Sequence, residues 1–337
     1  MPMRIALLGA GWAARAVYGP ALADYRKRRG GLTLAAVCDL DAARAAEVRA
    51  DFGFECAYTS LAELFRHARL DAAIAAVSVP HNAAVAQACL RAGLPTLVEK
   101  PPALTARAAR DLVRAVRRSR GRLMVAFNRR WAPALVRLKA LALEAGPIHG
   151  LRGDMCRIKR RDPDFSTTAI HTIDTLRFLT GADYAHLAIE YGRCGPEGQA
   201  ATYHALGAMT TGAAVAFDVV PMAGLDLERY TVHAGGRTFV AEIGFGKSPD
   251  TLVEWSAGRP RNVAFKSPSS ARHDAGGFYQ ELAAFLDAVK KGGPLPRPSA
   301  ADAVQSVTVM EALARRRARY HFRKDSSHGR QVQAAPQ

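Results

Sequence analysis

The stretch Val98-Glu99-Lys100-Pro101-Pro102 ends an apolar run and brings a carboxylate, an amine and two prolines together. A lysine shifts its pKa readily on burial and near other charges, so Lys100 could stabilise charge on a substrate oxygen or take part in proton transfer. Glu99 could orient that amine or tune its charge. The prolines fix the backbone where it leaves the run and bias Lys100 towards an extended conformation. A surface ion pair at a strand end is the alternative explanation.

His171 and Asp174 form a second pair, in a segment with helical periodicity at 165–181. A spacing of three puts two side chains on one helical face. A neutral His171 could accept a hydroxyl proton while Asp174 orients its ring or the substrate. A metal pair would need a third ligand that the sequence does not show, so we assign no metal site. A structural histidine is the remaining alternative.

A glycine-rich turn near the N-terminus has the spacing of a dinucleotide-binding motif. Residues 9–14 read G-A-G-W-A-A, after an apolar run and before a helical segment. Gly9 permits the tight turn, Gly11 lets a pyrophosphate approach the backbone, and a small residue at position 14 lets the helix pack on the strand. Trp12 and Ala13 lie in the same turn and are further candidates for cofactor binding.

An acidic residue, Asp39, ends the next apolar run. Its carboxylate could accept hydrogen bonds from the ribose hydroxyls of NAD, and its charge would repel the 2′-phosphate of NADP. Arg44, one helical turn further on, leaves NADP as an open alternative. Asp39 or Asp41 could instead cap the following helix.

Apolar runs alternate with amphipathic helical segments through the first part of the chain, at 3–8, 32–39, 71–79, 95–100 and 122–128. Such continuous runs are what a parallel sheet covered on both faces requires. We therefore predict a doubly wound α/β Rossmann domain over residues 1–125. Lys100, Asn128 and Arg129 then lie at the carboxyl ends of strands, where such sheets bind ligands, so Asn128 and Arg129 are candidates for substrate binding.

The alternation of strand-like and helical segments ends after Gly146. Strand-like segments then follow one another at 203–220, 227–244 and 251–265, with turn residues between them. We predict an α+β domain over residues 126–320 with an open, mainly antiparallel sheet and helices on one face. The uncovered face favours oligomerisation. Residues 321–337 lack periodicity and are predicted to form a flexible tail.

A basic cluster precedes the His171 segment. In a strand, Arg157, Lys159 and Arg161 would point to one side and form an anion-binding wall, with Arg160 between them. This arrangement favours an acidic substrate that carries a carboxylate or a phosphate group. An exposed basic edge that discourages strand pairing is the alternative.

The glycine turn, Asp39 and the stretch AGLPTLVEKPPALT together resemble the Gfo/Idh/MocA family of glucose-fructose oxidoreductase, inositol dehydrogenase and MocA. The resemblance continues through FNRRWAPAL and AIHTIDTLRFLTG to the C-terminal helical segments. It implies an NAD(P)-dependent dehydrogenase or reductase with Lys100 as a catalytic residue. It also implies cofactor contacts at Val79, Pro80, His81, Glu99 and Lys100. The predicted reaction is hydride transfer between nicotinamide and a secondary alcohol or ketone carbon of a sugar, sugar acid, nucleotide sugar or polyol.

One departure from the family pattern lies at Thr167. Many members read D-x-G-x-H-x-x-D, whereas this chain has Thr167 four residues before His171. A hydroxyl exchanges hydrogen bonds but cannot carry charge or act as a base. Thr167 therefore stays a candidate for substrate binding only. The departure also supports the competing hypothesis, a non-catalytic NAD(P)- or sugar-binding sensor of the same fold.

The amino-acid composition restricts the classes of partner that the chain is expected to bind. The formal net charge of +17 raises the possibility of nucleic-acid binding, but the basic residues are scattered without aromatic interleaving, so we expect none. No apolar run reaches the roughly 18 residues that a membrane span requires, so we expect no membrane partner. The 5 cysteines show no paired spacing, which favours the cytoplasm.

Overall fold

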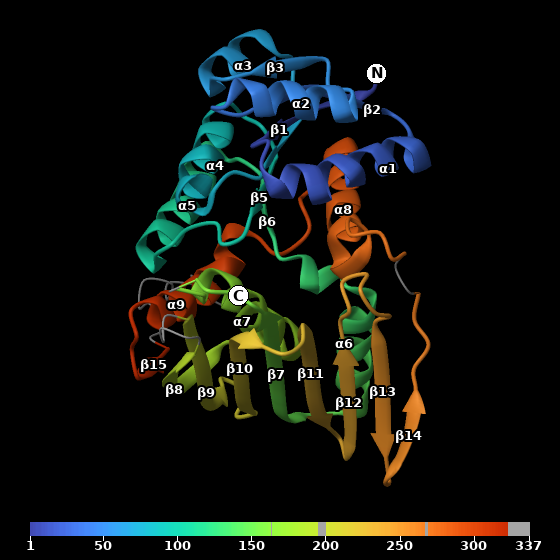
Figure 1. The fold of residues 1–337 in the computed structure, drawn as a ribbon, viewed down its shortest axis with the longest axis vertical. Helices are drawn as coiled ribbons and strands as arrows, with labels where there is room; N and C mark the ends of the chain where they lie inside the picture. Colours follow the sequence, from blue (N-terminus) through green and yellow to red (C-terminus); the bar gives the residue numbers. More distant parts are fainter. Residues whose placement is uncertain (163, 195–199, 267–268, 323–337) are drawn as a thin grey trace, which may run out of the picture.

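The first half of the chain folds into a six-stranded parallel sheet (Figure 1). The structure, a computed structural model, describes residues 1–162, 164–194, 200–266 and 269–322. The strands lie in the order β3-β2-β1-β4-β5-β6, and every neighbouring pair is parallel. The predicted Rossmann sheet is confirmed. Its strands are β1 (Met3–Leu8), β2 (Leu32–Cys38), β3 (Cys56–Tyr58), β4 (Ala72–Ala75), β5 (Thr96–Glu99) and β6 (Leu123–Ala126).

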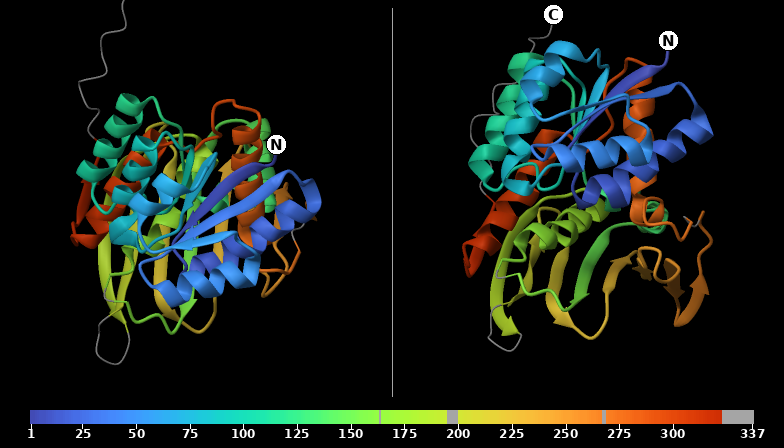
Figure 2. Two further views of the ribbon diagram at one scale, coloured as in Figure 1. Left: turned by 90° about the horizontal axis from the view of Figure 1, so that it is seen from above. Right: turned by 45° about the horizontal axis from the view of Figure 1, so that its top comes forward.

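Helices cover both faces of this sheet because its strands are apolar on both sides. Ile5 and Leu7 of β1 pack in one cluster with α1, α2 and α8, whereas Ala6 and Leu8 pack in another with α3 and α4. Figure 2 shows α4 and α5 on one side of the sheet and α1 and α2 on the other. The helices of this half are α1 (Gly19–Arg29), α2 (Ala42–Phe52), α3 (Leu61–His67), α4 (Asn82–Arg91) and α5 (Ala106–Ser119), with a π-helix at Ala14–Tyr18 and 3-10 helices at Val79–His81 and Asn128–Trp131.

The second half forms a nine-stranded sheet in the order β14-β13-β12-β11-β7-β10-β9-β8-β15. Every neighbouring pair is antiparallel except β7 with β10, so the predicted open, mainly antiparallel sheet is confirmed. The turn between β11 and β12 uses Gly235 and Gly236, whose φ angles of 52° and 74° suit a tight hairpin. The strands are β7 (Ile148–Ile158), β8 (Tyr184–Cys194), β9 (Ala200–Met209), β10 (Ala214–Ala223), β11 (Leu227–Ala234), β12 (Arg237–Glu242), β13 (Thr251–Ser256), β14 (Arg259–Asn262) and β15 (Arg319–His321).

Three helices pack on one face of the nine-stranded sheet. They are α6 (Pro133–Ala145), α7 (Ser166–Thr180) and α9 (Ala300–Ala314). The helix α9 begins at a capping box, in which Ser299 accepts from the Asp302 amide and Asp302 accepts from the Ser299 amide. Figure 1 shows α7 between the nine-stranded sheet and the Rossmann domain. This position lets α7 present side chains to the crevice of the parallel sheet.

The helix α8 (Phe278–Lys290) returns from the second half of the chain to the Rossmann sheet. Leu282 and Phe285 pack in the same cluster as Leu97 of β5 and Met124 of β6. The predicted domain boundary at residue 125 falls inside β6, and a segment assigned to the second domain completes the core of the first. The two halves therefore share a hydrophobic cluster as well as a crevice.

The predicted C-terminal tail overlaps a short strand. The strand β15 pairs with β8 and ends at His321, where the tail was expected to begin. Residues 323–337 lie outside the described part of the chain. Among the described residues, no helix combines the length and the apolar character that crossing a bilayer would need.

Candidate active site

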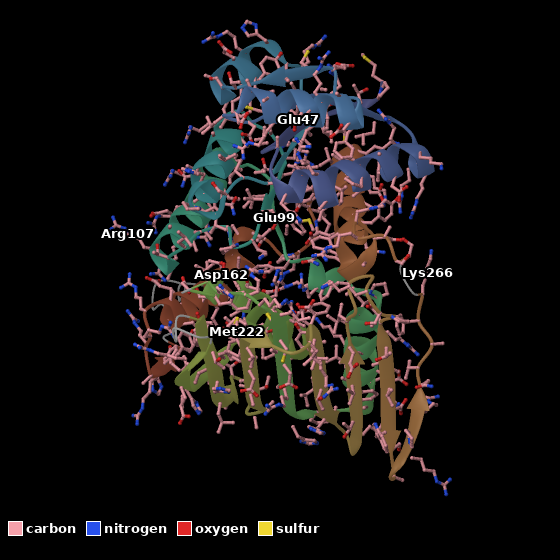
Figure 3. All side chains as sticks on the ribbon, viewed as in Figure 1. Glu47, Glu99, Arg107, Asp162, Met222 and Lys266 are labelled. Carbon is pink, nitrogen blue, oxygen red and sulfur yellow. The ribbon has the colours of Figure 1, made fainter. Side chains whose placement is uncertain are left out.

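A cleft of about 540 Å³ lies between the two halves of the molecule. Its walls come from the carboxyl ends of β4 and β5, from the glycine turn after β1, from α7 and from loops at the edge of the second sheet. Figure 3 shows Glu99, at the end of β5, near the middle of the molecule between the two sheets. A volume of this size suits a cofactor fragment together with a small substrate.

The glycine turn forms one end of the cleft. Gly9 has a φ of +99°, and a Cβ there would lie 2.3 Å from the carbonyl oxygen of Ala76, so no other residue fits. A Cβ on Gly11 would meet no atom within 4 Å, which leaves its open side free for a ligand. Trp12 and Ala13 line the cleft directly. The residues present therefore fit a dinucleotide pyrophosphate.

Asp39 is held beside this turn. Its carboxylate accepts hydrogen bonds from the amides of Ala10 at 2.7 Å and of Asp41 at 2.9 Å. The helix cap is Asp41, whose side chain accepts from the Arg44 amide, so the cap and the candidate ribose-binding residue are different residues. The guanidinium of Arg44 lies 3.3 Å from Asp39 and 3.0 Å from Asp41.

Lys100 reaches from the Rossmann domain to the second domain. Its ammonium nitrogen donates to the main-chain oxygen of Thr167, in the first turn of α7, at 3.3 Å. Burial lowers the pKa of Lys100 to about 8, an effect that Glu99 opposes and Arg129 reinforces. Burial also raises the pKa of Glu99, although Lys100 and a 2.8 Å hydrogen bond from the Tyr18 hydroxyl favour its charged form.

His171 lies one helical turn beyond Thr167 and lines the same cleft. Only 7% of its surface is exposed. Burial, together with the positive charges of Arg129 and Lys100, lowers its pKa well below the ordinary value of 6.5. The imidazole is therefore neutral at physiological pH. Its Nδ1 has no hydrogen-bond partner in the described part of the chain.

A buried carboxylate organises the floor of the cleft. Glu228 accepts from Arg129 at 2.6 and 3.1 Å and also pairs with Arg157, so one carboxylate serves two guanidiniums. Burial alone would raise the pKa of Glu228, but the two guanidiniums lower it to about 2. Phe245 packs against Arg129, with 4.4 Å between the guanidinium carbon and the ring centre.

Residues 3–127 match a family model described as an oxidoreductase family with an NAD-binding Rossmann fold, GFO_IDH_MocA. The chain is 28% identical over 300 residues to inositol 2-dehydrogenase 1 of Saccharopolyspora erythraea, and this alignment covers 85% of the chain and 86% of that protein. The match and this relative both support the resemblance to the Gfo/Idh/MocA family. The predictions of this family, of an oxidoreductase and of NAD as its cofactor are confirmed.

Solved structures share the fold of this chain over nearly its whole length. A levoglucosan dehydrogenase in complex with NADH and levoglucosan superposes with a TM-score of 0.78 at 20% identity, covering 94% of this chain and 97% of that one. An oxidoreductase from Agrobacterium radiobacter also gives 0.78, at 21% identity and with 95% and 98% coverage. At these identities the likeness concerns the fold.

Helical spacing led to the expectation that Asp174 orients His171 or the substrate, but its carboxylate has other partners. Both oxygens of Asp174 bind Arg130, at 2.7 and 2.9 Å, and Ser306 donates to it at 2.8 Å. Asp174 is 1% exposed and does not line the cleft. Arg130 and Ser306 of α9 engage its carboxylate, although helical spacing places Asp174 on the same face as His171.

The predicted anion-binding wall has a different composition from the one expected. The strand β7 ends at Ile158, and Lys159 has a φ of +54°, so the alternation that would align Lys159 and Arg161 with Arg157 stops there. Arg157 and Arg160 line the cleft, whereas Lys159 and Arg161 do not.

Several other predicted contacts do not line the cleft. The amide of Asn128 donates to the Gly276 carbonyl at 2.7 Å, and its side-chain oxygen accepts from Arg129. Thr167 offers its main-chain oxygen to Lys100, while its neighbour Thr168 lines the cleft. Of the three residues predicted after β4, Val79 lines the cleft, but Pro80 and His81 do not.

No local sequence pattern indicates several of the residues at the cleft, because loops distant in the chain supply them. Lys247, Arg272 and Asp226 line it, and Glu228 lies behind its guanidiniums. Asn82 is fully buried and donates to the carbonyls of Glu99 at 3.1 Å and Pro101 at 2.9 Å, which fixes the backbone on either side of Lys100.

Proposed function

We propose that this enzyme reversibly oxidises a secondary alcohol of a sugar or polyol to the ketone, with NAD as the hydride carrier. One observation carries the proposal. The ammonium of Lys100 and the imidazole of His171 line one cleft. Lys100 also donates a hydrogen bond to the main-chain oxygen of Thr167, one helical turn before His171. Relatives named inositol 2-dehydrogenase and D-apiose dehydrogenase, the latter 33% identical over 105 residues, support the substrate class.

The turn at residues 9–13 and Asp39 would hold NAD, which when bound supplies the hydride-accepting nicotinamide carbon. Lys100 is mainly protonated at neutral pH and can stabilise negative charge on the substrate oxygen. His171 is neutral and can accept the hydroxyl proton. At neutral pH, Lys100 therefore carries a positive charge and His171 carries none.

We propose further that the substrate carries an anionic group. Six basic side chains line the cleft, namely Lys100, Arg129, Arg157, Arg160, Lys247 and Arg272, against the acidic residues Glu99 and Asp226. Glu228 behind them reduces the excess of positive charge without removing it. The diphosphate of NAD would offset part of this excess, and a carboxylate or phosphate on the substrate would balance the rest.

The reaction is tested by following NADH absorbance with matched pairs of sugars, such as glucose with glucuronate and galactose with galacturonate. The anionic member of each pair is expected to give the higher kcat/KM, and preference for the neutral member would exclude an anionic substrate. Lys100→Met and His171→Asn are expected to lose turnover while NADH binding persists. Full activity in either variant would remove that residue from the mechanism.

We also propose a homodimer or homotetramer that works in the cytoplasm. The face of the nine-stranded sheet opposite α6 and α7 carries ion pairs such as Arg152 with Asp218 and an exposed Leu206. Cys38, Cys56, Cys89 and Cys156 are free thiols, as is usual in a reducing compartment. Light scattering coupled to gel filtration would measure the mass, and a monomeric mass would overturn the assembly.

A further inference from the structure

Trp12 and Arg272 meet across the mouth of the cleft. Trp12 belongs to the glycine turn of the Rossmann domain, and Arg272 comes from the loop that precedes α8. The guanidinium carbon lies 5.2 Å from the centre of the indole ring, within the range of a cation–π contact. Trp12 is 62% exposed, so this contact is formed on an open surface between two distant segments.

The charge of Arg272 is not neutralised by an ion pair. Two other guanidiniums of the cleft, Arg129 and Arg157, share Glu228, and Lys247 pairs with Asp226. Within the described ranges, no carboxylate lies within ion-pair distance of Arg272. Desolvation in the cleft and then the positive charges of Arg129 and Arg157 lower its pKa. An anion at this position would relieve that repulsion.

The neighbouring turn shows which anion could come there. The open side of Gly11 faces free space, and the helix that follows has no side-chain cap at Ala13 and no acidic residue in its first turn. In an NAD-binding Rossmann domain, the anion that comes to such a glycine turn is the dinucleotide diphosphate. A guanidinium stacked on the Trp12 ring lies within side-chain reach of the same turn.

We propose that Arg272 is a cofactor-binding residue, which ion-pairs with the diphosphate of NAD from the second domain while Trp12 holds its guanidinium in place. This proposal rests on the NAD-dependent function proposed above. The diphosphate is then held from two sides, by the amides of the glycine turn and by Arg272. A ligand that lacks the diphosphate gains nothing from the contact.

The test compares binding of ADP-ribose, which contains the diphosphate, with binding of adenosine, which does not, by titration calorimetry on the full chain. Arg272→Ala is expected to weaken ADP-ribose binding about tenfold or more, as for loss of a charge-assisted hydrogen bond, and to change adenosine binding less than twofold. Trp12→Ala removes the platform but keeps the charge, so its loss of ADP-ribose affinity should be smaller. Arg107→Ala is the matched control, because Arg107 is exposed on α5 at the edge of the molecule (Figure 3).

Unchanged ADP-ribose affinity in Arg272→Ala would overturn the proposal. A raised substrate KM with unchanged ADP-ribose affinity would also overturn it, because Arg272 would then serve the substrate. If the parent protein turns over NADH and only the Arg272 effect is missing, the proposed function stands and this inference alone fails. If the parent protein binds neither NADH nor ADP-ribose, both fail.

Discussion

The carboxylate of Asp174 forms a two-point ion pair with Arg130, through contacts of 2.7 and 2.9 Å, in a region where both side chains are nearly buried. The pair joins α7 to the 3-10 helix that follows β6, and Ser306 of α9 adds a third bond. These bonds fix α7, and therefore His171, relative to the Rossmann domain. Asp174 thus acts at a distance from the chemistry, as a residue that positions the helix.

Asp174→Asn is expected to lower stability more than it lowers turnover. Removing the charge leaves the guanidinium of Arg130 buried without its partner, which costs about 3–5 kcal/mol in comparable pairs. Urea unfolding measures this loss, and kcat of the folded protein should stay within a few-fold of the parent value. His171→Asn should show the opposite pattern, with stability kept and kcat lost. A stable but inactive Asp174→Asn enzyme would return Asp174 to the catalytic machinery.

The sequence was sufficient where a local pattern determines the outcome. The apolar runs located the parallel strands, and the glycine spacing located a turn that the φ of Gly9 requires. The family stretch located Lys100 and His171, which the structure brings to one cleft. Each of these features depends on residues close together in the chain.

The sequence was insufficient where a side chain chooses a partner from a distant element. Helical spacing predicted a common face for His171 and Asp174, but Arg130 and Ser306 engage the carboxylate. Strand alternation predicted a role for Lys159, but its positive φ ends the strand. Arg272 reaches the cleft through a loop whose path depends on how the two domains pack, and no periodicity encodes that path.

The activity is expected to fall as pH rises through about 8, the value to which burial lowers the pKa of Lys100. The protonated fraction decreases above that pH, and only the ammonium form stabilises charge on the substrate oxygen, so kcat/KM should drop about tenfold per pH unit. His171 adds no matching change near 6.5, because its pKa lies well below that value. The measurement is kcat/KM against pH in buffers of constant ionic strength.

Lys100→Arg provides the control for this pH profile. A guanidinium stays charged throughout the range, so any residual activity of the variant should lack the alkaline limb. If the variant keeps the same limb as the parent enzyme, another group titrates and Lys100 is not its source.

Asp39 is expected to decide between NAD and NADP. Its carboxylate lies 3.3 Å from the Arg44 guanidinium. The negative charge of Asp39 would repel the 2′-phosphate of NADP, and it also neutralises Arg44, which could otherwise bind that phosphate. Asp39→Ser should raise the ratio of NADP to NAD in kcat/KM by about tenfold or more, and adding Arg44→Ala should reverse the gain. Equal losses with both cofactors would show that Asp39 supports the turn, through the Ala10 amide, and does not select the cofactor.

Glu228 is expected to make the stability of the protein sensitive to acid. Its pKa is lowered to about 2 against an ordinary 4.5, so its contribution is present above about 4.5 and is lost as pH falls towards about 2. Glu228→Gln should remove that contribution and cost about 3–5 kcal/mol of stability at neutral pH, since Arg129 and Arg157 would lose their shared carboxylate.

The matched control is Glu242→Gln. Glu242 pairs with Arg229 at the surface, so this substitution should cost less than about 1 kcal/mol of stability. Urea unfolding at several pH values separates the two, and similar costs for both variants would show that the buried cluster contributes no more than a surface pair.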